Sequence, residues 1–582
     1  MCGILVSCGL NQPFQQRLLN RLRKRGPDAT GFWSHAGVNL AHTRLAILGL
    51  DERGEQPLFN DTHVISYNGE IYNFLEINER LTACGIKLRG ASDTETLLHA
   101  WSMWGDRILS EMNGFWAFAV YDIKKGTLSL VRDQLGIKPL YYWASPDGVC
   151  ASSLLAPILE MVSAARELDY EAISEYVRYQ FTFGDKTFLK QIKKVLPGHI
   201  VEIDVKTGKT TTRCYEDIFK QPDDLAKVDD RWIEETRGLL RDCCIESTIS
   251  DTSFTTFCSG GIDSSLITRV TQPEIAYHCN YSDPECNETF FAKQVIADTD
   301  TRLFVVNADE SFNLVDRLSS LLEDFDEPTI GSVILPLEDL LTQVKRRYKV
   351  ILTGTGGDEL FAGYVRYQLA LGKCFQDSYK GLFAQMQGIS SPARRFELAH
   401  RKGTPGFYKF YEPVVERTFE EAYDACGTGQ DELQRMLTFD RRYFLAGLLN
   451  IDDKMCGRHS LEARPSFLNQ RFVRHLMGAN SSGFMAEDTL KWVGRKLAAG
   501  TLPDSVIYRT DKMGFTTPVG TFINQSSHLV REQITNSPFR HLYDLRKMNL
   551  TASNKFSREV FGLLMLDLWL NRYASKRYDA GA

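Results

Sequence analysis

The sequence predicts two parts: an α+β amino-terminal half of stacked antiparallel sheets flanked by helices, then an α/β half with a parallel sheet and a helical extension. Up to about residue 205, short aromatic and β-branched runs are separated by Gly, Asn, Asp and Pro, which is typical of antiparallel strands. Further on, short apolar strands alternate with helix-length segments, which is typical of βαβ units. The 582 residues also exceed what one hydrophobic core usually supports.

The first half contains four clear strand candidates and one helix. The strands are expected within "HVISYNGEIYNFLEI", "FWAFAVYD", "LSLVRD" and "LYYWAS", and a helix over 75–81 is expected on a sheet face. A polar stretch over 207–230 has no such pattern and is the expected linker. The predicted domains are therefore 1–206 and 231–582.

The second half predicts parallel strands at 254–258, 274–281, 302–307 and 349–354, and a largely helical chain from about residue 372. In sheets of this kind, ligands bind at the carboxyl ends of the strands. The segments that follow Cys258 and Leu352 are therefore the first candidates for a site.

The composition is that of an ordinary globular protein, with 43% hydrophobic and 24% charged residues. A formal net charge of −6 gives no reason to expect a nucleic-acid or membrane partner. No apolar run approaches ~18 residues, and the first residues lack the basic leader and apolar core of a secretory signal. Thirteen cysteines without a framework spacing suit a reducing compartment, and no Cys/His array indicates zinc. We expect a cytoplasmic protein; the sequence leaves its oligomeric state open, a homodimer included.

The loop "CSGGIDSS" (258–265) has the features of an anion site. It follows a strand and precedes a helix, and successive amides at a helix amino terminus bind anions. It lacks the lysine and spacing of a Walker A loop, and its aspartate suggests a neighbouring cation such as Mg²⁺. By itself it could be an ordinary glycine-rich turn. A second loop, "GTGGDELFAGY" (354–364), follows another parallel strand, and the two together could hold a nucleotide triphosphate and its metal.

These motifs, taken in order, resemble the glutamine-dependent asparagine synthetase family. The first half contains Cys-Gly-Ile after Met1, then "RGPDATG", "HTRLAI", "QPL", "YNGEIYN", "SDTE" and "RDQLGIKPLYY". The second half contains "SGGIDSS", which resembles the pyrophosphate loop of ATP pyrophosphatases, then "GGDELFAGY", "SLEARPSFLN" and "DKMGF". The resemblance covers nearly the whole chain. It implies an amino-terminal-nucleophile glutaminase domain joined to an ATP-pyrophosphatase-type synthetase domain.

The position of Cys2 has a chemical rationale. Removal of Met1 would leave Cys2 with a free α-amine of pKa near ~7.7–8.0, close to the ~8.5 of a thiol. Such an amine can take the thiol proton and later return one to departing ammonia. By position alone, Cys2 could equally be a small buried hydrophobe. The resemblance implies that it is the nucleophile that attacks the side-chain amide of glutamine.

The resemblance also assigns the rest of a glutamine site. Asn68 and Gly69 would donate to the oxyanion, although Asn-Gly is also a strong hairpin signal. Arg44 would bind the carboxylate of glutamine, and Glu70 and Asp93 would bind its ammonium group. Without the resemblance, these three would be ordinary surface charges.

In the second half, the resemblance implies activation of a carboxylate by ATP as an acyl-adenylate, with release of pyrophosphate. The implied Mg²⁺ ligands are Asp263 and Asp358. Lys512, in "DKMGF", would neutralise the α-phosphate during catalysis, although alone it would be a surface charge. The implied ATP-binding residues are Cys258, Ser259, Gly260, Gly261, Asp263, Ser264, Ser265, Asn280, Thr353 and Gly354.

The implied function is amidation of a carboxylate, with aspartate to asparagine as the default and glutamine, ATP and Mg²⁺ required. Two departures affect the acceptor. The family carries Glu between two glycines where this chain has Thr355, and "PFLD" appears here as "SFLN", with Ser466 and Asn469. Glu359, one helical turn on, is a candidate to replace the missing carboxylate. Ammonia would need a covered passage between the halves.

Three alternatives remain. One keeps the chemistry but changes the acceptor, to a sugar acid or a secondary-metabolite precursor. Another is a non-catalytic regulatory paralogue, which the intact Cys2, Asn68, Asp263 and Lys512 disfavour. The third, a transferase that feeds ammonia to a sugar phosphate or phosphoribosyl donor, would have no need of "SGGIDSS".

Overall fold

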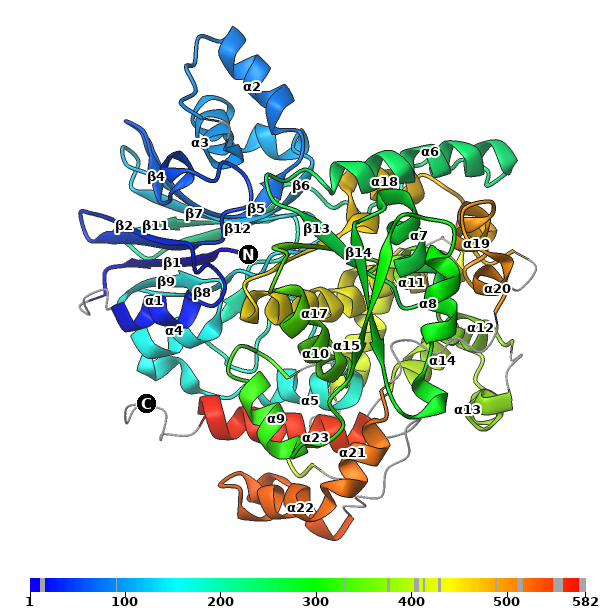
Figure 1. Cartoon of the computed structure of the whole chain (residues 1–582). Helices are drawn as coiled ribbons and strands as arrows, with labels where there is room; N and C mark the ends of the chain where they lie inside the picture. The colour runs from blue at the N-terminus through cyan, green and yellow to red at the C-terminus, as the bar shows by residue number, and fades with distance from the viewer. Residues whose placement is uncertain are drawn as a thin grey trace.

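The structure is a computed structural model, and both predicted halves are present in it (Figure 1). Two antiparallel sheets form the first half, and a parallel sheet with many helices forms the second, so the predicted fold class is confirmed. The described residues are 1–10, 16–90, 92–328, 331–373, 377–401, 408–411, 414–427, 431–486, 489–509, 517–547 and 558–574.

Each sheet of the first half has six strands. One has the order β10-β8-β9-β1-β3-β2 and the other β12-β11-β7-β6-β5-β4. The strands are β1 (Gly3–Cys8), β2 (Ala29–His35), β3 (Val38–Arg44), β4 (Leu58–Phe59), β5 (His63–Ile71), β6 (Gly114–Asp122), β7 (Thr127–Arg132), β8 (Tyr141–Ser145), β9 (Gly148–Ser152), β10 (Lys193–Lys194), β11 (His199–Asp204) and β12 (Thr210–Cys214).

The alternation of side chains along β5 explains how the sheets and helices are layered. Val64 packs in the cluster between the two sheets, whereas Ile65 and Tyr67 belong to the cluster beneath helices α2 (Phe74–Ala83) and α3 (Asp93–Trp104). Successive strand residues point to opposite faces, so a strand with apolar residues on both is buried on both. Helices α1 (Gln16–Leu22), α4 (Leu155–Met161) and α5 (Tyr170–Tyr179) complete this half.

The stretch over 207–230 is not wholly a linker. Its residues Thr210–Cys214 form β12, which pairs with β11 at the edge of the second sheet. Four of the five residues of β12 are exposed, so the strand lacks the apolar face by which a strand is recognised in sequence. Threonine favours extended backbone, which accounts for a polar edge strand here.

The second half is built on a five-stranded sheet of order β15-β14-β13-β16-β17, in which all pairs are parallel. Its strands are β13 (Phe254–Phe257), β14 (Ile275–Asn280), β15 (Arg302–Asn307), β16 (Val350–Thr353) and β17 (Glu462–Pro465). The first four lie where the sequence predicts them. The fifth was not predicted, because "EARP" carries two charges and ends in proline. The chain order reverses at β13, and such a switch point favours a ligand site between β13 and β16.

Helices cover both faces of this sheet and extend beyond it (Figure 1). Those around the sheet are α6 (Asp230–Glu246), α7 (Ile262–Thr271), α8 (Thr289–Ile296), α9 (Leu314–Leu321), α10 (Ile334–Val344), α11 (Gly357–Leu360), α17 (Leu445–Arg458), α18 (Gln470–Met477), α19 (Trp492–Ala498) and α20 (Asp504–Ile507). The extension contains α12 (Val365–Ala370), α13 (Lys380–Met386), α14 (Pro392–His400), α15 (Val414–Asp424), α16 (Glu432–Phe439), α21 (Val519–Gln525), α22 (Ser527–Asn536) and α23 (Arg558–Trp569).

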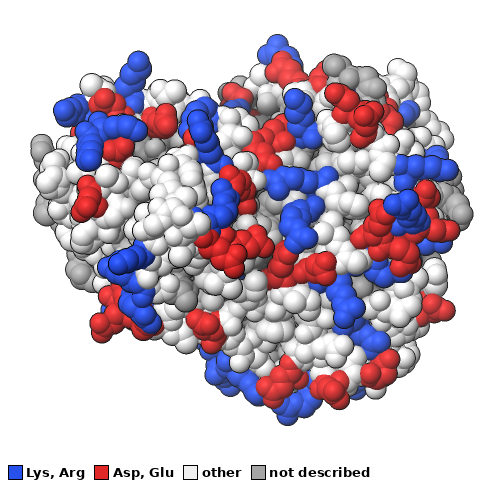
Figure 2. All heavy atoms as spheres, turned by 90° about the horizontal axis from the view of Figure 1, so that it is seen from above, with Lys and Arg blue, Asp and Glu red and all other residues white. Residues whose placement is uncertain are grey.

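Two surface properties bear on partners. Among the described residues, no helix has the length and apolarity needed to cross a bilayer. Figure 2 shows acidic and basic side chains interspersed over the face seen from above.

Candidate active sites

Cys2 lies at the start of β1, between the two halves of the chain. Its backbone N–H donates to Asn68 Oδ1 at 2.9 Å, and its thiol lies 3.9 Å from the carbonyl of Leu45. Met1 is fully buried, its α-amino nitrogen donates to the carbonyl of Leu461, and burial lowers the pKa of that amine to about 5. Burial raises the pKa of the Cys2 thiol. While Met1 is attached, the nitrogen of Cys2 is an amide and cannot serve as a base.

Asn68 and Gly69 lie beside Cys2 inside β5, opposite Ala117 and Trp116, and not in a hairpin turn. Because Asn68 Oδ1 accepts from Cys2, the Nδ2 group of Asn68 is left free to donate elsewhere. That Nδ2 is buried and has no hydrogen-bond partner among the described residues. A buried donor without an acceptor is costly, and one beside a thiol is suited to a developing oxyanion. A Cβ on Gly69 would lie 2.2 Å from the carbonyl oxygen of Phe115, so only glycine fits.

The predicted ammonium acceptors, Glu70 and Asp93, form a buried acidic cluster. Asp93 is at the amino terminus of α3, accepts from the Tyr67 hydroxyl at 2.8 Å, and has a pKa raised by burial to about 6. Glu70 Oε2 accepts from Arg464 at 2.9 Å, while its Oε1 is buried with no partner among the described residues. Burial first, then the charges of Asp93 and Glu462, raise the pKa of Glu70. Two carboxylates, Glu70 and Glu462, share the Arg464 guanidinium, and Asp93 adds a third carboxyl, so the cluster fits an added cation.

Arg44, the predicted carboxylate ligand, is the last residue of β3. Its guanidinium donates to the carbonyls of Asp51 at 2.8 Å and Leu48 at 3.2 Å, and also to that of Gly49. It therefore fixes the loop over 48–51. Beside this loop lies an open hollow of about 520 Å³, lined by Gly49, Leu50, Asp51, Arg53, Gly54, Ser92 and Asp251.

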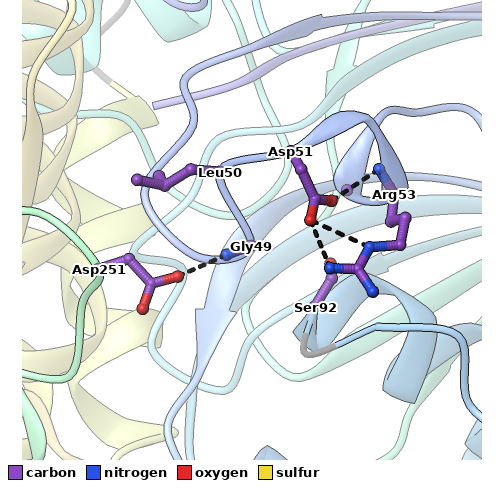
Figure 3. A pocket seen from close by; sticks show the side chains of 7 residues that line it. Gly49, Leu50, Asp51, Arg53, Ser92 and Asp251 are labelled. Carbon is purple, nitrogen blue, oxygen red and sulfur yellow. Dashed lines mark hydrogen bonds and ion pairs between the residues drawn. The ribbon is translucent and has the colours of Figure 1, made fainter.

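The hollow is built from both halves of the chain (Figure 3). In that view, Asp251, from the segment before β13, reaches the loop and accepts from the Gly49 N–H at 2.8 Å. Asp51 turns toward Arg53 and pairs with it at 2.5 Å. Ser92 is next to Asp93 in the chain, so the hollow lies between the Arg44 loop and the acidic cluster. This is where a small zwitterion could enter.

The second candidate site is formed by the loops after β13 and β16. In the first, Ser259 Oγ lies 2.9 Å from Ser264 Oγ, and the N–H of Ser259 donates to the same hydroxyl. Gly260 has φ +78° and a Cβ there would lie 2.6 Å from Phe291. A Cβ on Gly354 would lie 2.8 Å from the nitrogen of Ser264, so the two loops touch. The predicted phosphate loop is thus compact.

Asp263 and Asp358, the predicted metal ligands, come from different loops and meet at one cation. Lys491 Nζ lies 2.5 Å from Asp263 and 2.7 Å from Asp358. A Cβ on Gly357 would lie 2.5 Å from the carboxyl carbon of Asp263, and one on Gly363 would lie 1.9 Å from Asp358 Oδ1. Two converging carboxylates in a glycine-lined cradle fit a hard divalent cation. Lys491 was not identified from the sequence.

Cys258 and Asn280, which were also predicted to bind the nucleotide, have hydrogen-bond partners within the protein. The N–H of Cys258 donates to Tyr277, and its carbonyl lies 2.9 Å from His278 Nδ1. Asn280 Nδ2 donates to Asn307 at 3.0 Å. Among the other predicted residues, Ser265 is fully buried in α7, Gly261 caps α7, and Thr353 ends β16.

Lys512 and the rest of "DKMGF" lie outside the described residues. Arg509, three residues before Lys512, lies over the ring of Phe291 at 3.6 Å, and its Nη1 is 3.4 Å from the carbonyl of Gly260. Arg509 therefore lies beside the phosphate loop.

Helix α17 connects the two candidate sites. Arg25 donates to the Cys2 carbonyl at 2.9 Å and makes a buried pair with Asp453 of α17 at 2.7 Å. The adjacent residue, Asp452, accepts from the hydroxyl of Thr355 at 2.5 Å. One helix thus contacts Cys2 through an arginine and the loop after β16 directly.

The departures from the family pattern receive different explanations. Asn469 Oδ1 accepts from the N–H of Arg471 as the cap of α18, and its Nδ2 donates to Glu246 at 2.9 Å, a bond that an aspartate could not make. Ser466 is buried, and its hydroxyl has no partner among the described residues. Glu359 faces Tyr364, which donates to it at 2.5 Å, so the carboxylate at Thr355 is that of Asp452.

The sequence interpretation missed four residues: Arg25, Asp452, Arg464 and Lys491. Arg25 and Arg464 lie inside the motifs "RGPDATG" and "SLEARPSFLN", so an arginine without an assigned role within a shared motif was the available signal. Asp452 lies within α17 and Lys491 directly precedes α19; neither belongs to a recognised motif, and only the fold brings them to the site.

Comparisons with known proteins agree with the division of the chain into these two sites. The family model described as glutamine amidotransferase domain matches residues 1–216, and the one described as asparagine synthase matches residues 235–571. The chain is 29% identical to asparagine synthetase (glutamine-hydrolysing) 3 of Bacillus subtilis, covering 88% of this chain and 86% of that protein. For asparagine synthetase 1 of the same organism, the identity is 27%, covering 97% and 95%. For a putative asparagine synthetase of Mycobacterium tuberculosis it is 26%, covering 95% and 92%.

Proposed function

The chain belongs to the asparagine synthase family, and from this premise we propose that it hydrolyses glutamine at Cys2 and uses the ammonia to amidate a carboxylate that ATP has activated. The observation that carries the proposal is the position of α17, which contacts Cys2 through Arg25 and the loop after β16 through Asp452. A helix in contact with both sites suits an enzyme that makes ammonia in one half and uses it in the other.

In the glutaminase step, removal of Met1 turns the nitrogen of Cys2 into the base that takes the thiol proton. The thiolate attacks the side-chain amide of glutamine, and Asn68 Nδ2 stabilises the oxyanion. Glu70 and Asp93 hold the ammonium group of glutamine, and Arg44 fixes the loop that receives its carboxylate. Departing ammonia takes a proton, and water then releases glutamate from the thioester.

In the synthetase step, the loop over 259–264 binds the phosphates of ATP and the loop after β16 positions the acceptor carboxylate. The carboxylate attacks the α-phosphorus, so that pyrophosphate leaves and an acyl-adenylate forms. Asp263 and Asp358 would hold Mg²⁺, which neutralises phosphate charge when bound. Lys491 keeps these two carboxylates paired. Ammonia then displaces AMP from the acyl carbon.

Aspartate is the default acceptor because of the family, and Thr355 favours a second candidate with another acid. A hydroxyl at this position does not supply the carboxylate that the resemblance leads one to expect beside the acceptor. A sugar acid or a secondary-metabolite precursor would then be the substrate, with the same chemistry.

The proposal predicts that ATP yields AMP and pyrophosphate, and only in the presence of a suitable acid. The measurement is pyrophosphate release by protein that begins at Cys2, with ATP, Mg²⁺ and glutamine, across a panel of carboxylic acids that includes aspartate. Chromatography of the nucleotides distinguishes AMP from ADP.

Production of ADP and phosphate would refute the adenylate, and no nucleotide turnover with any acid would favour a regulatory paralogue. Turnover with another acid but not with aspartate would establish the second candidate.

A further inference from the structure

The strand that ends at Thr353 leads to an unusual arrangement of hydroxyls around one carboxylate. Thr355 Oγ1 lies 2.5 Å from Asp452 Oδ2, and Thr353 Oγ1 lies 3.3 Å from that same oxygen and 3.3 Å from Thr355 Oγ1. Both threonines come from the end of β16, while Asp452 comes from α17, which is about a hundred residues further along the chain. The carboxylate of Asp452 is thus held against the hydroxyl of Thr355.

The arrangement is located where the acyl group must form. Gly354 lies between the two threonines and packs against the Asp263–Ser264 backbone, and Asp358 follows three residues after Thr355. An acid bound to attack the α-phosphorus of ATP in this cradle has its carboxyl carbon beside the loop over 353–355. Asp452 is partly exposed and lies beside this loop.

The residue next to Asp452 in α17 contacts the glutaminase half. This residue, Asp453, is bound to Arg25, which holds the Cys2 carbonyl. The charge of Lys138 acts on both aspartates, and Lys138 Nζ lies 3.0 Å from the sulfur of Met1. Asp452 is therefore adjacent to the residue through which α17 is linked to Cys2.

We propose that Asp452, with the Thr355 hydroxyl as its hydrogen-bonded partner, is the base that removes a proton from the nitrogen as ammonia attacks the acyl-adenylate. The inference rests on the proposed function and adds a catalytic residue to it. It also makes Thr355 and Asp452 one unit, in which an aspartate on α17 supplies the carboxylate that this chain lacks at position 355.

The step balances without another reactant. The nitrogen forms a bond to the acyl carbon and becomes positively charged, and the carbon–oxygen bond to AMP breaks. One proton passes from nitrogen to Asp452, either directly or through Thr355, which accepts it at Oγ1 and gives its own to Oδ2. The products are the amide, AMP and protonated Asp452, which then releases its proton to solvent.

The electrostatics of Asp452 suit a proton acceptor. Burial raises its pKa to about 6, against hydrogen bonds from Thr355 and Thr353 that lower it. The charged groups that face it are Asp453 on its own helix and Lys138 from the first half. The carboxylate is ionised above about pH 6, so its contribution is present at neutral pH and is lost as the pH falls through 6.

The test separates adenylation from amide formation. Exchange of labelled pyrophosphate into ATP is measured with the acid that gives the wild type its greatest pyrophosphate release. Amide formation is measured with glutamine as nitrogen source and glutamate release as a parallel readout. For Asp452→Asn, we expect exchange and glutamate release close to wild type and amide formation lower by roughly 10²–10⁴-fold, the usual contribution of a general base. In the wild type, the rate of amide formation, corrected for glutamate release, should decline below about pH 6. This decline should be absent in the variant.

A matched control is Glu338→Gln, on α10, which packs against α17. Glu338 pairs with Arg458 and His459 at the end of α17, away from Thr355, so its loss should leave the ratio of amide formation to exchange unchanged. Thr355→Ser, which keeps the hydroxyl, should retain more amide formation than Thr355→Val.

Each outcome is decisive. Normal amide formation by Asp452→Asn would exclude the base while leaving the proposed function intact. Equal loss of exchange and amide formation would assign Asp452 a structural role only. If the wild type shows no exchange with any acid, the proposed function itself fails, and this inference with it.

Discussion

Cys2→Ala should lose glutamine hydrolysis while keeping ammonium-dependent amide formation. Loss of a covalent nucleophile removes the thioester route altogether, so we expect glutamate release to fall by about 10⁴-fold or more. The activating loops lie after β13 and β16, and Cys2 is linked to them indirectly, through Arg25 and α17. Supplying ammonium salts should therefore restore pyrophosphate release and amide formation in the variant. Glutamate is measured enzymatically and the amide by mass spectrometry.

The control for this variant is Cys84→Ala, which changes an exposed cysteine at the end of α2. It should match the wild type in both assays. Loss of the ammonium-dependent activity in folded Cys2→Ala protein would contradict two separable sites.

Asp263→Asn should have the opposite effect. Asp263 and Asp358 are the two carboxylates that converge in the cradle, and replacing one by an amide removes a negative ligand for the cation that accompanies ATP. We expect pyrophosphate release to fall by roughly 10²–10³-fold, as when one electrostatic contact to a transition state is lost. Glutamate release should persist because Cys2, Asn68 and the acidic cluster are unchanged.

Asp298→Asn is the matched control, because the Asp298 carboxylate is exposed on the same half, where it pairs with Arg269. A pair with a solvent-screened carboxylate contributes little, so the activity of this variant should equal that of the wild type. If Asp263→Asn left pyrophosphate release intact, the convergence of the two carboxylates would have a structural role only.

The parts of the fold that followed from sequence are those in which apolar periodicity determines structure. β6 is buried along eight of its nine residues, and β13 to β16 alternate with helices, so their patterns are visible locally. β17 could not be predicted in this way. Glu462 and Arg464 are buried within it because Arg464 pairs with Glu462 and, across the halves, with Glu70. Such a strand depends on partners about four hundred residues away, and no local pattern reveals them.

The residues of the candidate site also differ in whether a local sequence pattern could reveal them. Cys2, Asn68 and the loops with Asp263 and Asp358 were found because each motif is contiguous in sequence. Lys491 was missed because its role arises from the folded chain, which places its ammonium group between two distant carboxylates. Asp452 was missed for the same reason, and Glu359, the candidate from sequence, accepts a hydrogen bond from Tyr364.

The central claim is that nitrogen passes from glutamine at Cys2 to an activated carboxylate within one protein. The most direct test is to follow that nitrogen. Wild-type protein that begins at Cys2 is given glutamine labelled with ¹⁵N in its side-chain amide, together with ATP, Mg²⁺ and the preferred acid. Unlabelled ammonium is present in excess. The ¹⁵N content of the amide product is then measured by mass spectrometry. The account predicts that the amide carries ¹⁵N in far greater proportion than the bulk ammonium does. An amide with the isotope composition of the bulk ammonium would contradict transfer between the two sites.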